Sequence, residues 1–312
     1  MENMMSHNIE SLFYTREKPW HGLGIMVQEA PTSAEALHLA GLDWRVEGKP
    51  VFTAEGVEIP NYKANTRDSD NSVLGIVTDR YKVVQNTEAF EFTDAIVGGD
   101  VHYETAGSLS AGKRIWLLAK MPNITVAGDD MEPYLCFTNT HDGSGAVRVC
   151  MTPVRVVCNN TLNIALNTAK RAWSTKHIGD MQIKLQEAKM ALELAGEYMY
   201  ALDKYADQMA NTTISDDKVR DILNELFPTK EDDSDRVKAT TRKIKDEYMV
   251  CLFMPDLNKF RGTSWGALNA MCDMVDHNAP QRMTEKYQEN NWARIIDGHY
   301  LVDAMASKLA II

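Results

Sequence analysis

Hydrophobic positions alternate with polar ones over short runs in the first half of the chain, and they follow a helical spacing in the second half. Alternation is typical of half-buried β-strands, and a spacing of three or four residues is typical of amphipathic helices. The sequence therefore predicts an α+β fold: a central antiparallel sheet with flanking helices, followed by a mostly helical C-terminal half. We expect residues 1–178 to form the α+β core domain, and residues 179–312 to form a helical region that packs on it or serves oligomerisation.

Turn residues divide the first half into its elements. Asp142-Gly143-Ser144-Gly145 is a clear turn, because glycine accepts the positive φ that hairpin turns require. The polar run 68–72 resembles a calcium loop, but the glycine and the closing glutamate of an EF-hand are absent, so a hairpin turn is predicted. We expect β structure from 51 to 84, strands at 101–107, 113–119, 133–140 and 146–157, and helices at 32–40, at 87–96 and from about Asn160.

Helices account for the rest of the chain. One long helix is predicted over 180–210, a second from Ser215 to Leu226, and a third, charged on most faces, over 230–250. A further helix opens at 262–270 and ends near His277, and the segment 289–312 is again helical. Most of the 17 methionines lie in this half, where a flexible side chain fills irregular gaps in a core or a subunit contact.

Composition and charge narrow the class of protein. The chain has 44% hydrophobic and 25% charged residues, no apolar run of membrane-spanning length, and an N-terminus without a signal-peptide pattern, so we expect a cytoplasmic protein without membrane contact. Five cysteines, an odd number, indicate a reducing compartment, and without CxxC pairs they predict no metal site. The net charge of −11 argues against nucleic-acid binding by the whole surface.

One part of the chain differs in charge. Residues 131–185 contain six basic and three acidic residues, which gives this part alone a net positive charge. A local basic strip on an acidic body can bind phosphates, because ionic screening makes that contact short-ranged. The alternative is a solvated helix end that carries a few lysines and arginines.

Sequence motifs give little support for catalysis. No glycine-rich nucleotide loop and no HExxH motif is present, and no cofactor and no catalytic residue are predicted. Asp273, Asp276 and His277 can share one end of a helix, which allows a metal or acid–base role. A histidine that stabilises a helix C-terminus is the alternative.

Four motifs spread over the chain carry a resemblance to a known family. They are Trp20-His21-Gly22-Leu23-Gly24, the run from Tyr81 to Asn86, the run from Thr152 to Leu162, and the run from Gly262 to Ala270 with Asp276-His277. Together they resemble the bacterial phage/plasmid-like protein family, whose function is unknown. The resemblance implies a protein encoded by a phage, prophage or plasmid and located in the bacterial cytoplasm.

The predicted architecture is also similar to the core of the single-strand annealing recombinases of phages. Those proteins form rings or filaments that hold single-stranded DNA in a basic groove without ATP. The similarity implies phosphate contacts from seven basic residues, backbone hydrogen bonds from two asparagines, and base stacking by Trp116 or Trp173. The basic residues and asparagines are Lys113, Arg114, Arg148, Arg155, Lys170, Arg171, Lys176, Asn159 and Asn160.

These observations predict a homo-oligomeric protein, a ring or filament, that binds single-stranded DNA and promotes strand annealing and recombination without ATP. One alternative is a protein-binding module, such as an inhibitor of a host defence complex with a host protein as its partner. The acidic body and the methionine-rich helical half suit that alternative. A second alternative is a metal-dependent enzyme that acts near Asp273, Asp276 and His277.

Overall fold

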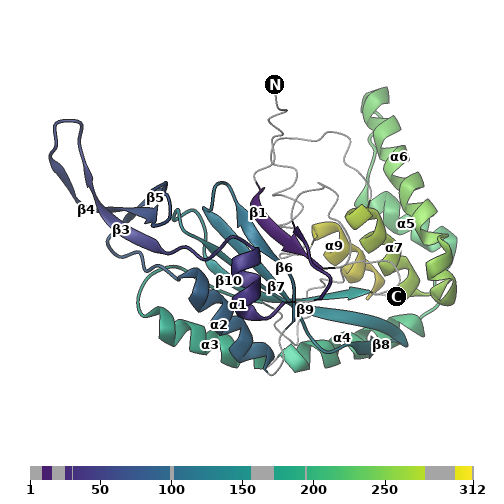
Figure 1. Cartoon of the computed structure of the whole chain (residues 1–312). Helices are drawn as coiled ribbons and strands as arrows, with labels where there is room; N and C mark the ends of the chain where they lie inside the picture. Colours follow the sequence, from purple (N-terminus) through teal and green to yellow (C-terminus); the bar gives the residue numbers. More distant parts are fainter. Residues whose placement is uncertain are drawn as a thin grey trace. The chain divides into compact units, whose positions relative to one another are not determined.

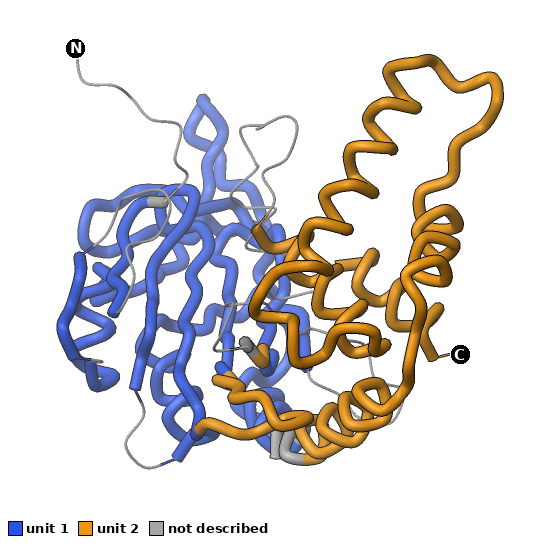
Figure 2. The backbone as a smooth tube through the Cα atoms, turned by 90° about the vertical axis from the view of Figure 1, so that its right-hand side faces the viewer, with its two compact units in different colours: residues 1–122, 134–151, 170–196 blue, residues 123–133, 152–169, 197–312 orange. Residues whose placement is uncertain are grey.

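The computed structural model describes residues 9–15, 25–29, 31–98, 102–155, 172–193, 195–277 and 299–310 (Figure 1). It has the predicted α+β fold, with a largely antiparallel sheet and helices followed by a mostly helical C-terminal region. Figure 2 shows the two compact units into which the chain divides. Unit 1 contains residues 1–122, 134–151 and 170–196, and unit 2 contains residues 123–133, 152–169 and 197–312.

The main sheet has eight strands, in the order β11-β10-β9-β7-β6-β1-β2, with β8 paired to β9. Every pairing whose register is described is antiparallel, except that β1 and β2 run parallel. The strands are β1 Ile9–Tyr14, β2 Ile25–Met26, β6 His102–Leu109, β7 Arg114–Lys120, β8 Ile124–Val126, β9 Asp129–Thr140, β10 Val147–Arg155 and β11 Ala172–Thr175.

Three helices cover one face of this sheet: α1 Ser33–Leu39, α2 Asn86–Val97 and α3 Met181–Glu193 (Figure 1). Alternate residues of the strands point toward the helices, so Phe13, Leu117 and Phe137 pack in one apolar cluster with helix residues such as Phe90 and Leu185. Complete burial of each such side chain stabilises the fold by about 1.5–3 kcal/mol relative to exposure. This cluster is the core of unit 1.

A second sheet of three strands forms what we call the β-arm: β3 Val46–Phe52, β4 Glu58–Arg67 and β5 Val73–Thr78. The β3–β4 hairpin extends away from the rest of unit 1 (Figure 1). At its base, the backbone of Gly75 lies so close to Asp142 that an added Cβ would be 2.5 Å from the Asp142 Cα. The β-arm is thereby seated on the turn between β9 and β10, as only glycine allows.

Helices form most of unit 2. They are α4 Ala195–Ala210, whose first two residues belong to unit 1, α5 Asp216–Leu226, α6 Asp235–Leu252, the 3₁₀ helix η1 Pro255–Phe260, α7 Ser264–His277 and α9 Tyr300–Leu309. Ser215 caps α5 as predicted, because its hydroxyl accepts a hydrogen bond from the Lys218 amide. Tyr248 and Trp265 are fully buried between these helices, and the Tyr248 hydroxyl donates to the Ala267 carbonyl at 2.7 Å.

Some expectations fall elsewhere. The range 180–210, expected as one helix, contains two described helices, α3 and α4. The helix expected from Asn160 and half of the segment 289–312 lie outside the described residues. Among the described helices, none is long and apolar enough to cross a membrane.

Candidate functional site

Strand register gathers four of the predicted basic residues at one end of the main sheet. Arg114 begins β7 and pairs with Thr140, the last residue of β9. Arg148, near the start of β10, pairs with Ser174, near the end of β11. Lys113 precedes Arg114 and Lys176 follows β11, so both lie at this same end. We call this the turn end of the sheet, and the four residues are Lys113, Arg114, Arg148 and Lys176.

The remaining predicted residues divide into two groups. Trp116 is only 6% exposed, and Trp173 packs against the core cluster of unit 1, so both indoles contact protein in this structure. The side chain of Arg155 and the residues Asn159, Asn160, Lys170 and Arg171 lie outside what the structure describes. The described part of the predicted interface is therefore cationic rather than aromatic.

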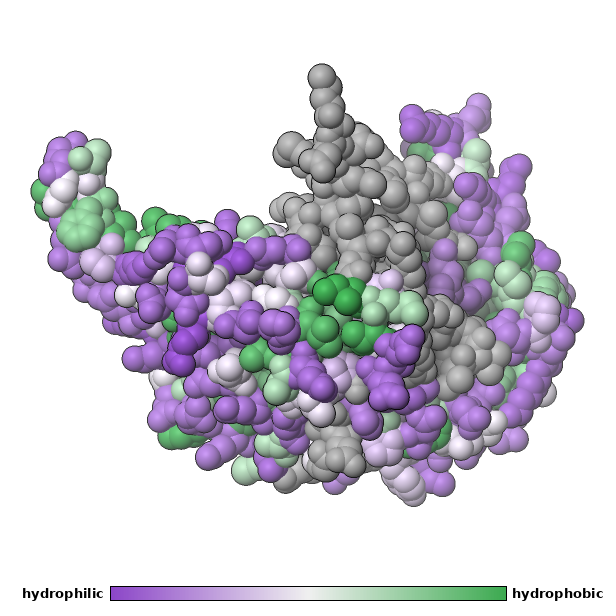
Figure 3. All heavy atoms as spheres, viewed as in Figure 1, coloured by the Kyte–Doolittle hydropathy of each residue, from purple (hydrophilic) through white to green (hydrophobic). Residues whose placement is uncertain are grey.

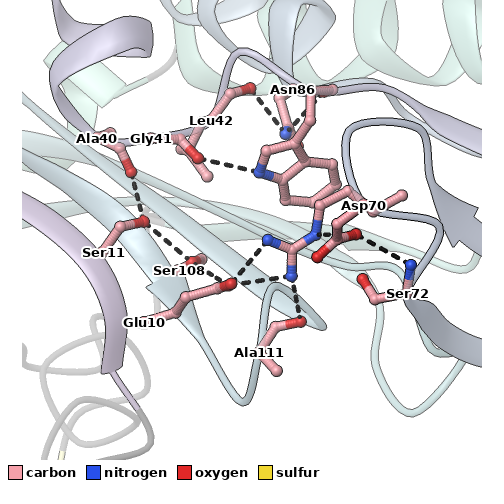
Figure 4. Close-up of polar contacts among 12 residues, drawn as sticks. Glu10, Ser11, Ala40, Gly41, Leu42, Asp70, Ser72, Asn86, Ser108 and Ala111 are labelled. Atoms are coloured by element: carbon pink, nitrogen blue, oxygen red, sulfur yellow. Dashed lines mark hydrogen bonds and ion pairs between the residues drawn. The ribbon is translucent and has the colours of Figure 1, made fainter.

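A buried arginine, Arg67, joins the β-arm to the turn end through Glu10 and Ala111, which Figure 4 labels. The Arg67 guanidinium pairs with the Glu10 carboxylate, with Nη1 to Oε1 at 2.7 Å, and its Nη2 donates to the Ala111 carbonyl at 2.9 Å. The same guanidinium lies over the Trp44 ring, 4.9 Å from the ring centroid. The Arg67 side chain is only 9% exposed, so its charge is matched inside the protein and is not available to a phosphate.

The other side of the same region holds a buried polar group that the sequence did not reveal. Nε2 of His141 lies 3.0 Å from Oδ1 of Asn86, whose Nδ2 donates to the carbonyls of Leu42 and Trp44. Because Oδ1 of Asn86 must accept, Nε2 of His141 carries the proton and Nδ1 is a bare acceptor. Burial lowers the pKa of His141 to about 3, so the ring is neutral at pH 7.

Three more acceptors lie around the last residues of β9. Asn65 donates its Nδ2 to the His141 carbonyl at 2.7 Å, and Asn139 donates its Nδ2 to the Val84 carbonyl, so Oδ1 of each amide is left to accept. His177 directs Nδ1 at the Lys82 carbonyl and stacks on Tyr81, whose hydroxyl donates to the Thr140 carbonyl. Nε2 of His177 is then an acceptor as well.

These four acceptors have no protein partner among the described residues: His141 Nδ1, His177 Nε2, Asn65 Oδ1 and Asn139 Oδ1. Unpaired polar atoms in a protein interior cost free energy, and ordered water is their usual donor. A group made only of neutral acceptors accepts hydrogen bonds from water or from a donor-rich ligand, and it repels anions. It is therefore distinct in chemistry from the cations at the turn end.

The alternative site near the end of α7 contains few metal ligands. Nε2 of His277 is 4.0 Å from Oδ1 of Asp273, one turn earlier on the same helix. Asp273 also accepts a hydrogen bond from the thiol of Cys251, and this contact, together with burial as the larger cause, raises the pKa of that thiol to about 12. No group of three or more His, Cys, Asp or Glu side chains in the described part of the chain is placed to hold a metal ion.

The buried acceptors around His141 and the ion pair of Arg67 and Glu10 could be predicted only in part from the sequence. Asn139-Thr140-His141 follows the apolar end of a strand, and such a polar run is usually a turn, so the burial of His141 depends on the β-arm above it. Arg67 and Glu10 are 57 residues apart, and strand β1 was not predicted. Register between distant strands, which sequence spacing does not give, creates both groups.

The fold and the turn end together define a mixed α+β protein whose sheet gathers basic side chains at one end. The chain belongs to the family described as Domain of unknown function (DUF932), whose model matches residues 73–295, more than half of the chain. The matched range begins at β5 and includes the turn end, α6 and α7. No significant match was found among curated proteins or among solved structures.

Proposed function

We propose that this protein binds single-stranded DNA and promotes annealing of complementary strands without ATP, as a phage- or plasmid-derived protein of the DUF932 family. The observation that carries the proposal is the turn end of the sheet, where register brings together four cations that are spread over more than 60 residues of sequence. Phosphates of a nucleic-acid backbone are the natural partners of such a group.

The size of the effect can be estimated from counterion release. Binding of four phosphates on a single strand gives a slope of about −3 in a plot of log affinity against log salt concentration. The overall charge of −11 opposes long-range attraction, so we expect binding to be strong only at low salt. Because the indoles of Trp116 and Trp173 both pack in the protein, the proposal rests on the basic residues and not on base stacking.

Fluorescence anisotropy with labelled single-stranded DNA at two salt concentrations tests the proposal. Lys113→Gln/Lys176→Gln removes two charges whose side chains have no partner among the described residues, so the fold should be kept. Lys189→Gln/Lys230→Gln removes two exposed charges elsewhere and serves as the matched control. We expect the first variant to lose about one unit of salt slope, and the control to behave like wild type.

Two results would contradict the proposal. One is the absence of wild-type binding at low salt, and the other is an equal loss in the control variant. If binding follows the expected pattern, Lys170→Ala/Arg171→Ala extends the test to the basic pair just before β11. Annealing is then measured with two complementary strands in the absence of nucleotide, and binding without faster annealing would restrict the function to binding.

A second candidate function, protein binding, is favoured by the exposed surface of the β-arm. Five large hydrophobic residues between positions 52 and 76 are exposed, and Figure 3 shows hydrophobic residues along the projecting β3–β4 hairpin. They are Phe52, Val57, Tyr62, Val73 and Ile76. Register places Tyr62, Val73 and Ile76 on one face of the β-arm, because Ala64 pairs with Ile76 and Thr66 with Val73.

Such a cluster on a protruding element is typical of an interaction surface. It supports either the homo-oligomer that we propose or contact with a host protein. Light scattering after gel filtration distinguishes self-association from binding to a host protein, with Tyr62→Ser/Ile76→Ser as the test variant. Wild-type oligomers that this variant dissociates would assign the surface to self-association. A monomeric wild type would exclude a stable homo-oligomer and leave a different protein as the partner.

A further inference from the structure

Helix α6 in unit 2 carries a dense basic segment that the turn end does not include. Residues 236–245 contain five basic residues and no acidic one, and no other stretch of ten residues in the sequence contains as many. They are Arg236, Lys238, Arg242, Lys243 and Lys245. Acidic residues flank the segment on both sides, at Asp235 and at Asp246. The net charge of the chain therefore does not reveal the positive charge of this segment.

The basic segment is exposed for a structural reason. The buried residues of α6 are confined to its last turns, from Tyr248 to Leu252, and none of residues 235–247 is buried. The first half of α6 therefore extends beyond the packed part of unit 2, as Figures 1 and 2 show. Ser234 stabilises the start of this helix as its N-cap, because its hydroxyl accepts a hydrogen bond from the Val237 amide.

Little of this charge is neutralised by the protein. Lys243 pairs with Glu247 at 3.5 Å on the helix surface, and Lys245 donates to the amide oxygen of Asn224 at 2.8 Å. Lys238 donates to the backbone carbonyl of Glu231 and not to a carboxylate. Arg236 and Arg242 have no hydrogen-bond or ion-pair partner among the described residues.

We propose that the basic segment of α6 is a second contact site for the phosphates of single-stranded DNA. The inference rests on the proposed function for the identity of the polyanion. Arg236 and Lys243 lie seven residues apart, which places them on one side of the helix about 10 Å apart along its axis. Arg242 is also exposed, about 100° around the helix axis from Lys243, so the three cations cover adjoining sides of the helix, which a flexible strand follows more easily than a rigid duplex.

The composition of α6 favours a nucleic acid over a membrane. A helix that lies on a lipid surface needs a broad apolar face of Leu, Phe or Trp opposite its basic face. The exposed half of α6 contains only Val237 and Ile244 as large hydrophobic residues. The alternative, an ordinary solvated helix with alternating charges, does not fit α6. Its five cations lie together in residues 236–245, and the carboxylates lie on either side of them.

The test uses the full-length protein and the triple variant Arg236→Gln/Arg242→Gln/Lys243→Gln. Its matched control, Lys189→Gln/Lys218→Gln/Lys230→Gln, makes the same change in net charge at exposed positions outside α6. The readout is anisotropy of labelled single-stranded DNA over a series of salt concentrations, with helix content checked by circular dichroism. We expect the α6 variant to lose about two units of salt slope and at least tenfold in affinity at low salt, and the control to keep both.

The outcomes separate the two proposals. Unchanged binding by the α6 variant, or an equal loss in the control, overturns the α6 site and leaves the turn end to be judged by its own variant. Loss in the α6 variant with no effect of Lys113→Gln/Lys176→Gln moves the DNA contact from the turn end to α6. Absence of wild-type binding overturns both. Tighter binding to phosphatidylserine vesicles than to single-stranded DNA overturns the α6 site in favour of a lipid partner.

Discussion

Nε2 of His141 lies 3.0 Å from Oδ1 of Asn86, and this contact fixes both the tautomer and the charge of the histidine. Protonation of Nδ1 would place a positive charge in the protein interior, close to the buried guanidinium of Arg67. Burial is the largest cause of its lowered pKa, and the nearby His177 and Arg67 lower it further. The neutral ring is thus a condition of the native fold.

The first prediction is a loss of stability in mild acid. The pKa of His141 is about 6.5 in the unfolded chain and about 3 in the folded protein, so below pH 6.5 the unfolded state binds a proton that the folded state does not. The free energy of unfolding should fall by about 1.4 kcal/mol per pH unit between pH 6 and pH 4 for this group alone. Urea denaturation at several pH values measures this slope.

Two variants isolate the contribution of His141. His141→Gln cannot titrate, so it should be less stable at pH 7.5 and show a shallower dependence on pH. His38→Gln, which removes an exposed histidine that pairs with Asp43 on the surface, is the control for the loss of a histidine. The pKa of His177 is also lowered, mainly by burial, so part of the slope should remain in His141→Gln. Equal slopes in wild type and His141→Gln would count against the assigned burial.

The second prediction concerns the ion pair of Arg67 and Glu10. Arg67→Met removes the contacts with Glu10 and with the Ala111 carbonyl, but it leaves the Glu10 carboxylate one-third exposed and able to bind water. We expect a loss of about 2–3 kcal/mol in unfolding free energy, below the full cost of an unpaired buried charge. Lys49→Met, on the same β-arm but at an exposed pair with Glu47, should change stability by less than about 1 kcal/mol.

The third prediction follows from strand packing in unit 1. A Cβ at Gly107 would lie 2.7 Å from both the Leu12 Cβ and the Trp116 ring, and closer still to the Ser11 carbonyl oxygen. None of these neighbours is the end of a flexible chain, so Gly107→Ala should destabilise the fold by about 1–3 kcal/mol or more. Gly48→Ala is the control, because it meets only the flexible side chain of Lys63. Thermal unfolding should therefore separate the two variants by several degrees.

Short-range signals in the sequence account for most of the elements that were predicted. The turn at 142–145, the helix at 86–97 and the Ser215 cap each depend on residues within a few positions of one another. The α+β class follows from the spacing of hydrophobic residues, which alternates in the strands and repeats every three or four residues in the helices. This spacing is a property of the sequence and does not depend on packing. What sequence could not give is pairing between distant segments, such as β1 between β6 and β2, because register depends on the whole sheet.

The candidate site shows the same limit. Lys113, Arg114, Arg148 and Lys176 were each expected to contact phosphates from the similarity to annealing recombinases, but only register reveals that they share one end of a sheet. The basic segment of α6 does not stand out in the net charge of the surrounding region, because acidic residues on either side of it cancel its positive charge. Burial of His141 and Arg67 is a tertiary property, since both residues belong to types that are usually exposed or intermediate.

The last prediction concerns the thiols, and it bears on the alternative of an enzyme in the helical region. Cys251 is buried and its pKa is raised to about 12 by burial and by the hydrogen bond to Asp273, so almost none of it is thiolate at pH 7.5. Cys136, Cys150 and Cys272 are also buried, and each is a thiol rather than half of a disulfide. Brief alkylation of the native protein, followed by peptide mass spectrometry, should leave these four residues unmodified, whereas alkylation in urea should modify all four. Rapid native modification of Cys251 would indicate an activated thiol beside Asp273 and would revive a catalytic role for the end of α7.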